Sequence, residues 1–412
     1  MIRDPLTIYL LVWYRNMKNF IRNTCHLLIF ISLSLFLFSC SKSHVSHSKQ
    51  LSLKKLTVHK DLAISAGMPD VKIGSFGDLA VDKKGNIYIS DPKLLKIHIF
   101  TSDGHYDSSI GQKGKGPGEF SSIDNKIKII KDTLYVQDFV QRRIDLFNIH
   151  NKTWIRSINL PNAKLNGVSL GSPRDMLPLP DGNIMESFRL PYYTQPKKMT
   201  HQMTISLFDH NGNFIKKDVI QNPVLYPTDQ ALVHIQKASG HISGLQVFSH
   251  LTFYPTTILT TDTKGHLFIG RTDSLSLNEY DEKGQLTGNV KVNSLIAKMT
   301  DQLKDSLLFK VPFTSSLYRK LLKKVGIPKY WPAWQNILFD KKGRYYVELF
   351  SPGMANQTWW VFDTDGKPNW KFKLSRNISL YVIRNHEAYG VWSKKGKYPK
   401  IVRYYFDLRS SE

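Results

Sequence analysis

Residues 77–110, GDLAVDKKGNIYISDPKLLKIHIFTSDGHYDSSI, contain the pattern that decides the fold. Four short runs of alternating apolar residues are separated by clusters of Asp, Lys, Gly and Asn. Glycine and asparagine adopt positive φ at little cost, so such clusters close hairpins between antiparallel strands. We therefore predict four strands, at 79–81, 87–90, 97–100 and 106–110, that together make one blade of a β-propeller.

The same rhythm recurs along the chain, which indicates a fold built from repeats. Further copies are predicted at 126–160, 175–220, 257–293, 334–374 and 379–407. The last copy has room for only three strands, and the segment 51–62, LSLKKLTVHKDL, can supply its outermost strand and cover the open edge. The expected fold is an all-β, six-bladed β-propeller whose N-terminal strand closes the last blade.

One stretch departs from the period of two. Residues 294–333 contain SLIAKMTDQLKDSLLF and SLYRKLLKKVG, whose apolar positions recur at helical spacing. We expect a small helical insertion here, between blades 4 and 5.

The N-terminus predicts the compartment. Residues 17–40, MKNFIRNTCHLLIFISLSLFLFSC, combine a basic start, a short apolar run and a final Leu-Phe-Ser-Cys that resembles a bacterial lipobox. We expect Met17 to be the true start, 1–16 to be a misassigned upstream segment and 17–39 to be a lipoprotein signal peptide. Cys40 is then the lipidated residue, 40–50 a flexible tether and 51–412 the propeller. A plain signal anchor is the alternative.

The net charge and the expected export together limit the classes of binding partner. The 57 Lys and Arg residues against 33 Asp and Glu give a net charge of +24. An exported protein rarely meets nucleic acid, so we expect an anionic glycan or an envelope protein as partner, besides the membrane that holds the lipid. In lipoproteins of the kind that this N-terminus resembles, an acidic cluster after the lipidated cysteine often marks surface export, and the residues after Cys40 contain none. The resemblance therefore implies a periplasm-facing position in the outer membrane or cell envelope rather than the cell surface.

Two sequence motifs carry a family resemblance. Residues 111–120, GQKGKGPGEF, follow the first blade, and the blade itself contains DKKGNIYISD. Together they resemble the NHL-repeat and six-bladed propeller lipoproteins common in Bacteroidota. The resemblance is strong over about 70–150, moderate over 326–347 and weak elsewhere. It implies the fold and a lipoprotein, and it implies no particular activity.

Connectivity favours one face of the propeller for binding. With strands a to d running outward from the axis, the b–c and d–a connections share one face, while the a–b and c–d connections share the other. All the long connections, at 189–198, 221–256 and 294–333, belong to the b–c/d–a face, and long loops on a rigid scaffold are where binding residues concentrate.

Candidate ligand-binding residues on that face combine guanidinium, ammonium and phenol groups, which suit stacking on sugars and capture of carboxylate or sulfate. For each of them a purely structural role is the competing interpretation. They are Arg142, Arg143, Arg189, Tyr192, Tyr193, Arg271, Lys395 and Tyr398.

The sequence gives little support for catalysis. His234, His241 and His250 share one connection, but their spacing places no pair four residues apart, so we predict no metal site and no cofactor. Asp91 and Asp138 end equivalent strands and are expected to bind the turn that follows. We expect a non-catalytic binding propeller; the alternatives are a metal-dependent hydrolase or lyase and a structural component of an envelope complex.

Overall fold

The computed structural model describes residues 52–67, 71–123, 127–162, 164–165, 168–189, 203–219, 232–238, 241–248, 255–292, 298–300, 328–351, 354–384 and 386–407. The chain divides into Met1–Ser52, of which only Ser52 is described, and the compact unit Leu53–Glu412. None of the described residues forms a helix long and apolar enough to cross a membrane.

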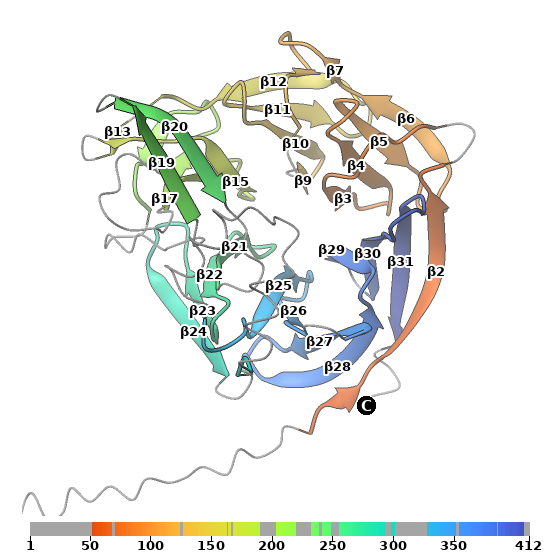
Figure 1. Cartoon of the computed structure of the whole chain (residues 1–412). Coiled ribbons are helices and arrows are strands. Elements are labelled where there is room, and N and C mark those ends of the chain that lie inside the picture. Colours follow the sequence, from red (N-terminus) through yellow and green to blue (C-terminus); the bar gives the residue numbers. More distant parts are fainter. Residues whose placement is uncertain are drawn as a thin grey trace, which may run out of the picture. The chain divides into compact units, whose positions relative to one another are not determined.

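The described strands of this unit form six antiparallel blades arranged in a ring (Figure 1). Blade 1 contains β3 (Leu79–Val81), β4 (Ile87–Asp91), β5 (Lys96–Phe100) and β6 (Tyr106–Ile110). Blade 2 contains β9 (Ile127–Ile130), β10 (Thr133–Asp138), β11 (Arg143–Asn148) and β12 (Trp154–Asn159). Blade 3 contains β15 (Pro173–Pro178), β16 (Ile184–Arg189), β17 (Met203–Phe208) and β18 (Phe214–Lys216).

The other three blades follow the same order from the axis outward. Blade 4 contains β21 (Thr257–Thr261), β22 (Leu267–Arg271), β23 (Leu275–Tyr280) and β24 (Leu286–Val292). Blade 5 contains β25 (Trp334–Phe339), β26 (Tyr345–Leu349), β27 (Asn356–Phe362) and β28 (Pro368–Ser375). Blade 6 contains β29 (Ile378–Arg384), β30 (Glu387–Trp392), β31 (Lys400–Asp407) and, as its outermost strand, β2 (Thr57–Ser65).

Ring closure is visible in the contacts of the innermost strands. Each of β3, β9, β15, β21, β25 and β29 contacts the next, and β29 contacts β3. The predicted six-bladed fold is therefore confirmed.

The N-terminal segment closes the ring, as predicted, but it serves two blades. β2 pairs antiparallel with β31, in a register that joins Thr57 to Asp407 and Ser65 to Lys400. Just before it, β1 (Lys54–Lys55) pairs in parallel with β28 as a fifth strand of blade 5. Leu56, between the two, is 2% exposed and packs in the core shared by blades 5 and 6. We call residues 53–65 the closing segment.

The hydrophobic core is divided into layers between neighbouring blades. Separate clusters join blades 1 and 2, 2 and 3, 3 and 4, 4 and 5, 5 and 6, and 6 and 1. Sheets packed on both faces need apolar side chains on both faces, which is why the consecutive residues Ile87, Tyr88 and Ile89 of β4 are all buried. The ring must close for every layer to be covered.

The turns explain why the repeat needs glycine. In the c–d turn of blade 3, Gly212 has φ +89°, and an added Cβ would lie 2.5 Å from the Asn159 carbonyl oxygen of blade 2. Gly284 of blade 4 has φ +78°, and its Cβ would lie 1.9 Å from the Val219 carbonyl oxygen next to blade 3. Only glycine fits both the left-handed backbone and this close approach between blades.

Asp91 and Asp138 bind the turns after their strands, which confirms the prediction. Asp91 Oδ1 accepts from the Leu94 amide at 3.1 Å, and Asp138 Oδ1 accepts from the Gln141 amide at 3.0 Å. The same carboxylates also hold the connection that enters each blade, through the amides of Gly74 at 2.6 Å and Ser121 at 2.7 Å. Their role in the fold is to fasten neighbouring connections.

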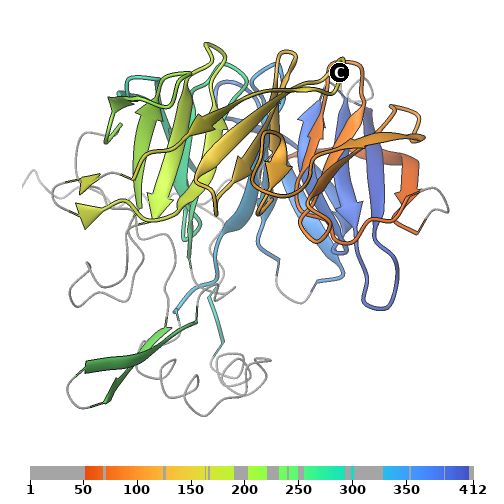
Figure 2. The same cartoon turned by 90° about the horizontal axis from the view of Figure 1, so that it is seen from above.

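The connections are distributed between the two faces as expected. The short pairs β7 (Gln112–Lys113) with β8 (Glu119–Phe120), β13 (Lys164–Leu165) with β14 (Val168–Ser169), and β19 (Leu232–Ala238) with β20 (His241–Phe248) all lie in d–a connections. Figure 2 shows the β19–β20 hairpin projecting from one side of the ring. The predicted helical insertion falls largely on residues 301–327, outside the described residues, and the described residues contain no helix.

Candidate functional site

The paired arginines of blade 2 are occupied by the protein's own backbone. Arg142 donates to the carbonyl oxygens of Gly171 at 2.7 Å and Pro161 at 3.2 Å, and its guanidinium lies over the Phe188 ring. Burial lowers the pKa of Arg142. These contacts favour the structural interpretation of Arg142 over ligand binding.

Arg143 is more deeply buried than Arg142 and makes more contacts within the protein. It is 8% exposed, pairs with Asp145 at 2.9 Å, and donates to the carbonyl oxygens of Lys115 at 2.9 Å and Gly116 at 2.8 Å. It also donates to the Glu119 carbonyl oxygen. Arg143 therefore holds the GKGPGEF connection on blade 2, and its guanidinium is not available on the surface for a ligand.

The other predicted residues remain scattered. Arg271 ends β22 and is half-exposed, with Nε and Nη2 donating to Asp273 Oδ2 at 3.0 and 2.8 Å. Lys395 and Tyr398 are exposed on the b–c connection of blade 6, where Tyr398 lies beside Gly67. Arg189 ends β16, but its side chain is outside the description, as are Tyr192, Tyr193 and the lipidation candidate Cys40.

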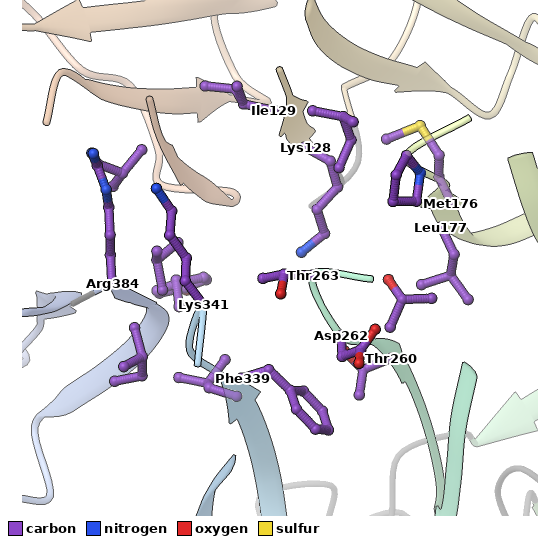
Figure 3. A pocket seen from close by; sticks show the side chains of 18 of the residues that line it. Lys128, Ile129, Met176, Leu177, Thr260, Asp262, Thr263, Phe339, Lys341 and Arg384 are labelled. Carbon is purple, nitrogen blue, oxygen red and sulfur yellow. The ribbon is translucent and has the colours of Figure 1, made fainter. Parts of the chain in front are cut away.

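A cavity on the propeller axis offers a different candidate. It measures about 630 Å³ and receives residues from all six blades, as Figure 3 shows for one part of its wall. Most of the lining comes from the later residues of the innermost strands and from the a–b turns. This axial cavity therefore opens toward the a–b/c–d face, opposite the face that carries the long connections. Its size is within the usual range for small-molecule sites.

The acidic residues of the axial cavity are used by their own blades. Asp82 Oδ1 accepts from the amides of Lys84 at 2.8 Å and Asn86 at 2.9 Å. Asp262 does the same with the amides of Lys264 at 2.8 Å and His266 at 2.9 Å. A carboxylate bound in this way by a turn is already compensated.

The basic residues of the axial cavity are arranged differently. Lys128 of β9 and Lys341 of the blade 5 a–b turn both line the cavity: Lys128 points toward its middle, and Lys341 runs along the wall beside Arg384 (Figure 3). Neither has a hydrogen-bond or ion-pair partner among the described residues. Arg384 uses its guanidinium on the carbonyl oxygens of Asp82 and Lys83, which leaves its positive charge unneutralised.

Two other cations of the cavity wall act on Lys341. Burial, followed by the charges of Arg384 and Lys83, lowers the pKa of Lys341. Like charges held together raise the free energy of the empty site, and an anion placed between them relieves that repulsion. The electrostatics of the axial cavity thus favour a negatively charged ligand.

The wall of the axial cavity between these charges is apolar. Half-buried aliphatic and aromatic side chains come from the innermost strands of blades 1, 2, 4, 5 and 6. They include Ile129, Leu259, Leu338, Phe339 and Val382.

Sequence reasoning missed this site. The signal was present in the a–b turn DKKG, where an aspartate serves the turn and two lysines follow it. Which of the two lysines faces the axis depends on the closed ring: Lys341 lines the cavity and Lys342 does not. Among the described residues there is no group of three His, Cys, Asp or Glu side chains that could hold a metal ion.

Comparisons with known proteins agree on the fold. A family model described as a 6-bladed beta-propeller, DUF5128, matches residues 69–236. A Bacteroides fragilis protein described as exported is similar in structure, with a TM-score of 0.51, 12% identity, and coverage of 86% of this chain and 99% of its own. A DUF4221 family member from Bacteroides vulgatus has a TM-score of 0.50 and 14% identity, again with 86% and 99% covered.

More distant likenesses include enzymes. A gluconolactonase from Xanthomonas campestris has a TM-score of 0.42 and 12% identity over 84% of this chain and 98% of its own. That likeness is too low to bear on catalysis in this chain. No curated protein matches the sequence.

Proposed function

We propose that this chain is a lipid-anchored envelope protein of the NHL-repeat type whose propeller binds an anionic ligand in the axial cavity, by recognition and without bond chemistry. The observation that carries the proposal is the contrast inside the cavity. Asp82 and Asp262 are compensated by their own turns, and Asp175 accepts a hydrogen bond from the Ser187 hydroxyl of the neighbouring strand, whereas Lys128 and Lys341 have no partner among the described residues. A ligand that supplies negative charge would complete the site.

Ligand binding tests this proposal directly. Inorganic phosphate, citrate and octanoate are titrated calorimetrically at low and moderate salt, with octanol as the neutral comparison. Removing one cation by Lys128→Met or Lys341→Met should weaken binding of an anion by about 10- to 100-fold, which corresponds to one lost charge-assisted hydrogen bond of about 1.5–3 kcal/mol.

Lys342→Met is the matched control, because Lys342 is an exposed lysine of the same turn that does not line the cavity. It should leave affinity unchanged, and added salt should weaken binding to the wild type. The proposal is rejected if no anion binds, or if the two cavity variants bind every anion as the wild type does.

Envelope anchoring has its own support and test. The lipobox-like ending at Cys40 supports it, as does the exported relative from Bacteroides fragilis. Cys40→Ala should release the protein from the membrane fraction and abolish labelling by a fatty-acid analogue. Cys25→Ala, inside the expected signal peptide, should change neither. Membrane retention and labelling of the Cys40→Ala protein would reject the anchor while leaving the cavity proposal untouched.

The b–c/d–a face supports a second candidate, the docking of an envelope protein. Tyr398 is 72% exposed there, next to the exposed Lys395. If that face binds a partner, replacing residues 301–327 by a short Gly-Ser linker, which keeps the connection from β24 to β25, should lose a co-purifying envelope protein while the propeller still folds. Lys395→Ala combined with Tyr398→Ala should weaken the same association.

A further inference from the structure

The lining of the axial cavity changes in character with depth. The a–b turns, at its mouth, supply Lys83, Lys131 and Lys341, and Arg384 ends β29 at the same level. The innermost strands, deeper along the axis, supply the half-buried apolar side chains. Lys128 is the one lining cation that belongs to the interior of a strand, and its ammonium group extends into the cavity (Figure 3).

Exposing the apolar side chains of this deeper layer to water is unfavourable in free energy. Ile129, Leu259 and Val382 each pack in part against a core layer and remain only half-buried where they line the cavity. Covering them with an apolar group would release water from that surface and contribute in proportion to the area removed. A compact ion such as phosphate could satisfy the lysines, but it would leave this surface exposed.

We infer that the ligand of the axial cavity is an amphipathic acid: an apolar chain or ring bound against the strand residues, with a carboxylate, sulfate or phosphate group held at the mouth by Lys128, Lys341 and the Arg384 charge. This inference rests on the proposed function and adds the chemical class of the ligand. The bound orientation follows from the layering, because the apolar part enters first and the charged group stays nearest the a–b turns.

A series of straight-chain acids tests the inference. Acetate, butanoate, hexanoate and octanoate carry the same charged group and differ only in apolar length. The dissociation constant, measured by calorimetry, should fall about two- to fourfold for each added CH₂ group. Octanol should bind much more weakly than octanoate.

Substitutions in the deep, apolar layer should separate the contribution of the ligand's apolar chain from that of its charged group. Ile129→Thr and Val382→Thr place a hydroxyl in the deep layer and should flatten the dependence on chain length while acetate binding stays unchanged. Val140→Thr, at a valine that is 59% exposed outside the cavity, is the control and should keep the full dependence. Thermal unfolding of each variant confirms that the propeller is intact.

The possible failures are distinguishable. If phosphate, citrate and all four acids bind equally and still need Lys341, the amphipathic ligand is rejected and the anion site stands. If octanol binds as tightly as octanoate, or Lys128→Met and Lys341→Met have no effect, the anion site itself is rejected. Binding to phosphatidylglycerol vesicles without binding to any soluble acid would also overturn the inference. The protein would then bind the negative charge of a membrane surface and not an acid inside the cavity.

Discussion

Arg143 shows what a basic side chain can do inside this fold. Its guanidinium joins the buried carboxylate of Asp145 to three carbonyl oxygens of the connection between blades 1 and 2. Arginine suits this task because its planar group offers several donors in fixed directions. A single residue therefore fastens a ten-residue connection that carries four glycines.

Replacing Arg143 should be severely destabilising. Arg143→Met leaves the Asp145 carboxylate buried without its cation, and we expect a loss of about 3–5 kcal/mol in the free energy of unfolding. Arg271→Met, which removes a half-exposed pair with Asp273, should cost no more than about 1 kcal/mol. Urea denaturation measures both. Equal, small effects of the two substitutions would contradict the structural role of Arg143.

Glu348 is a second residue whose environment has a measurable consequence. Burial raises its pKa to about 7, although a hydrogen bond from Gln335 and the charge of Arg376 act in the opposite direction. The folded protein therefore holds a proton on Glu348 at pH values where the unfolded chain, with an ordinary pKa near 4.5, has lost it. The stability that this proton provides is complete below pH 4.5 and declines as the pH rises toward 7.

The pH dependence of unfolding should reveal this group. Wild-type stability should fall by up to about 3 kcal/mol relative to Glu348→Gln between pH 4.5 and 7, since each pH unit in that window contributes up to about 1.4 kcal/mol. Glu282→Gln, at an exposed position, should keep the wild-type profile. Parallel profiles for the wild type and Glu348→Gln would show that the carboxyl titrates normally.

At the scale of elements, the closing segment joins two blades with three kinds of contact. β1 adds a parallel strand to blade 5, Leu56 enters the core between blades 5 and 6, and β2 completes blade 6. Arg403 of β31 also pairs with Asp61 across the β2 edge at 2.9 Å. The segment thus protects the outer edges of both blades from pairing with other chains.

Within the closing segment, substitution of Leu56 should reduce the stability of the protein most. Leu56→Ala leaves a cavity between two blades, and we expect a loss of about 2–5 kcal/mol in unfolding free energy. Lys55→Ala, at the neighbouring exposed residue of β1, should cost less than about 0.5 kcal/mol. Chemical denaturation compares them. A similar loss of unfolding free energy for both variants would mean that the closing segment contacts the ring without stabilising it.

The sequence predicted the blades because their strands and turns are local patterns. Asp82 to Gly85 closes a hairpin through contacts within its own turn, so neighbours in sequence are enough to recognise it. Which strand pairs with β1, and whether Lys341 lies toward the propeller axis, depend instead on residues far apart in the chain. Arg142 and Arg143 were expected to bind a ligand because a sequence gives no sign of which carbonyl groups will surround a guanidinium.

The whole molecule depends on the pairing of β2, near the start of the described chain, with β31, its last described strand. Each core layer between blades is covered only when both neighbours are in place, so one open junction exposes apolar surface on two blades. Proteins of this type should unfold as a unit, with no blade stable alone. The innermost strands, which contact one another around the whole ring, define the axial cavity by the same closure.

Truncation from the C-terminus tests this dependence. A chain that ends at Asp407 keeps β31 and should unfold in one calorimetric transition, as the full chain does. A chain that ends at Pro399 lacks β31, which leaves β2 without a partner, and should lose that single transition. Retention of one transition at the same temperature would show that the ring does not need its closing strand pair.

The register of Thr57 with Asp407 has a consequence for biogenesis. An early strand must wait, unpaired, until the last part of the chain has been made and delivered to the same compartment. Blades can begin to form one after another, but the ring cannot close early on the ribosome. If the chain is exported as proposed, this late closure leaves the polypeptide unfolded enough to pass through a translocation channel until transport is complete.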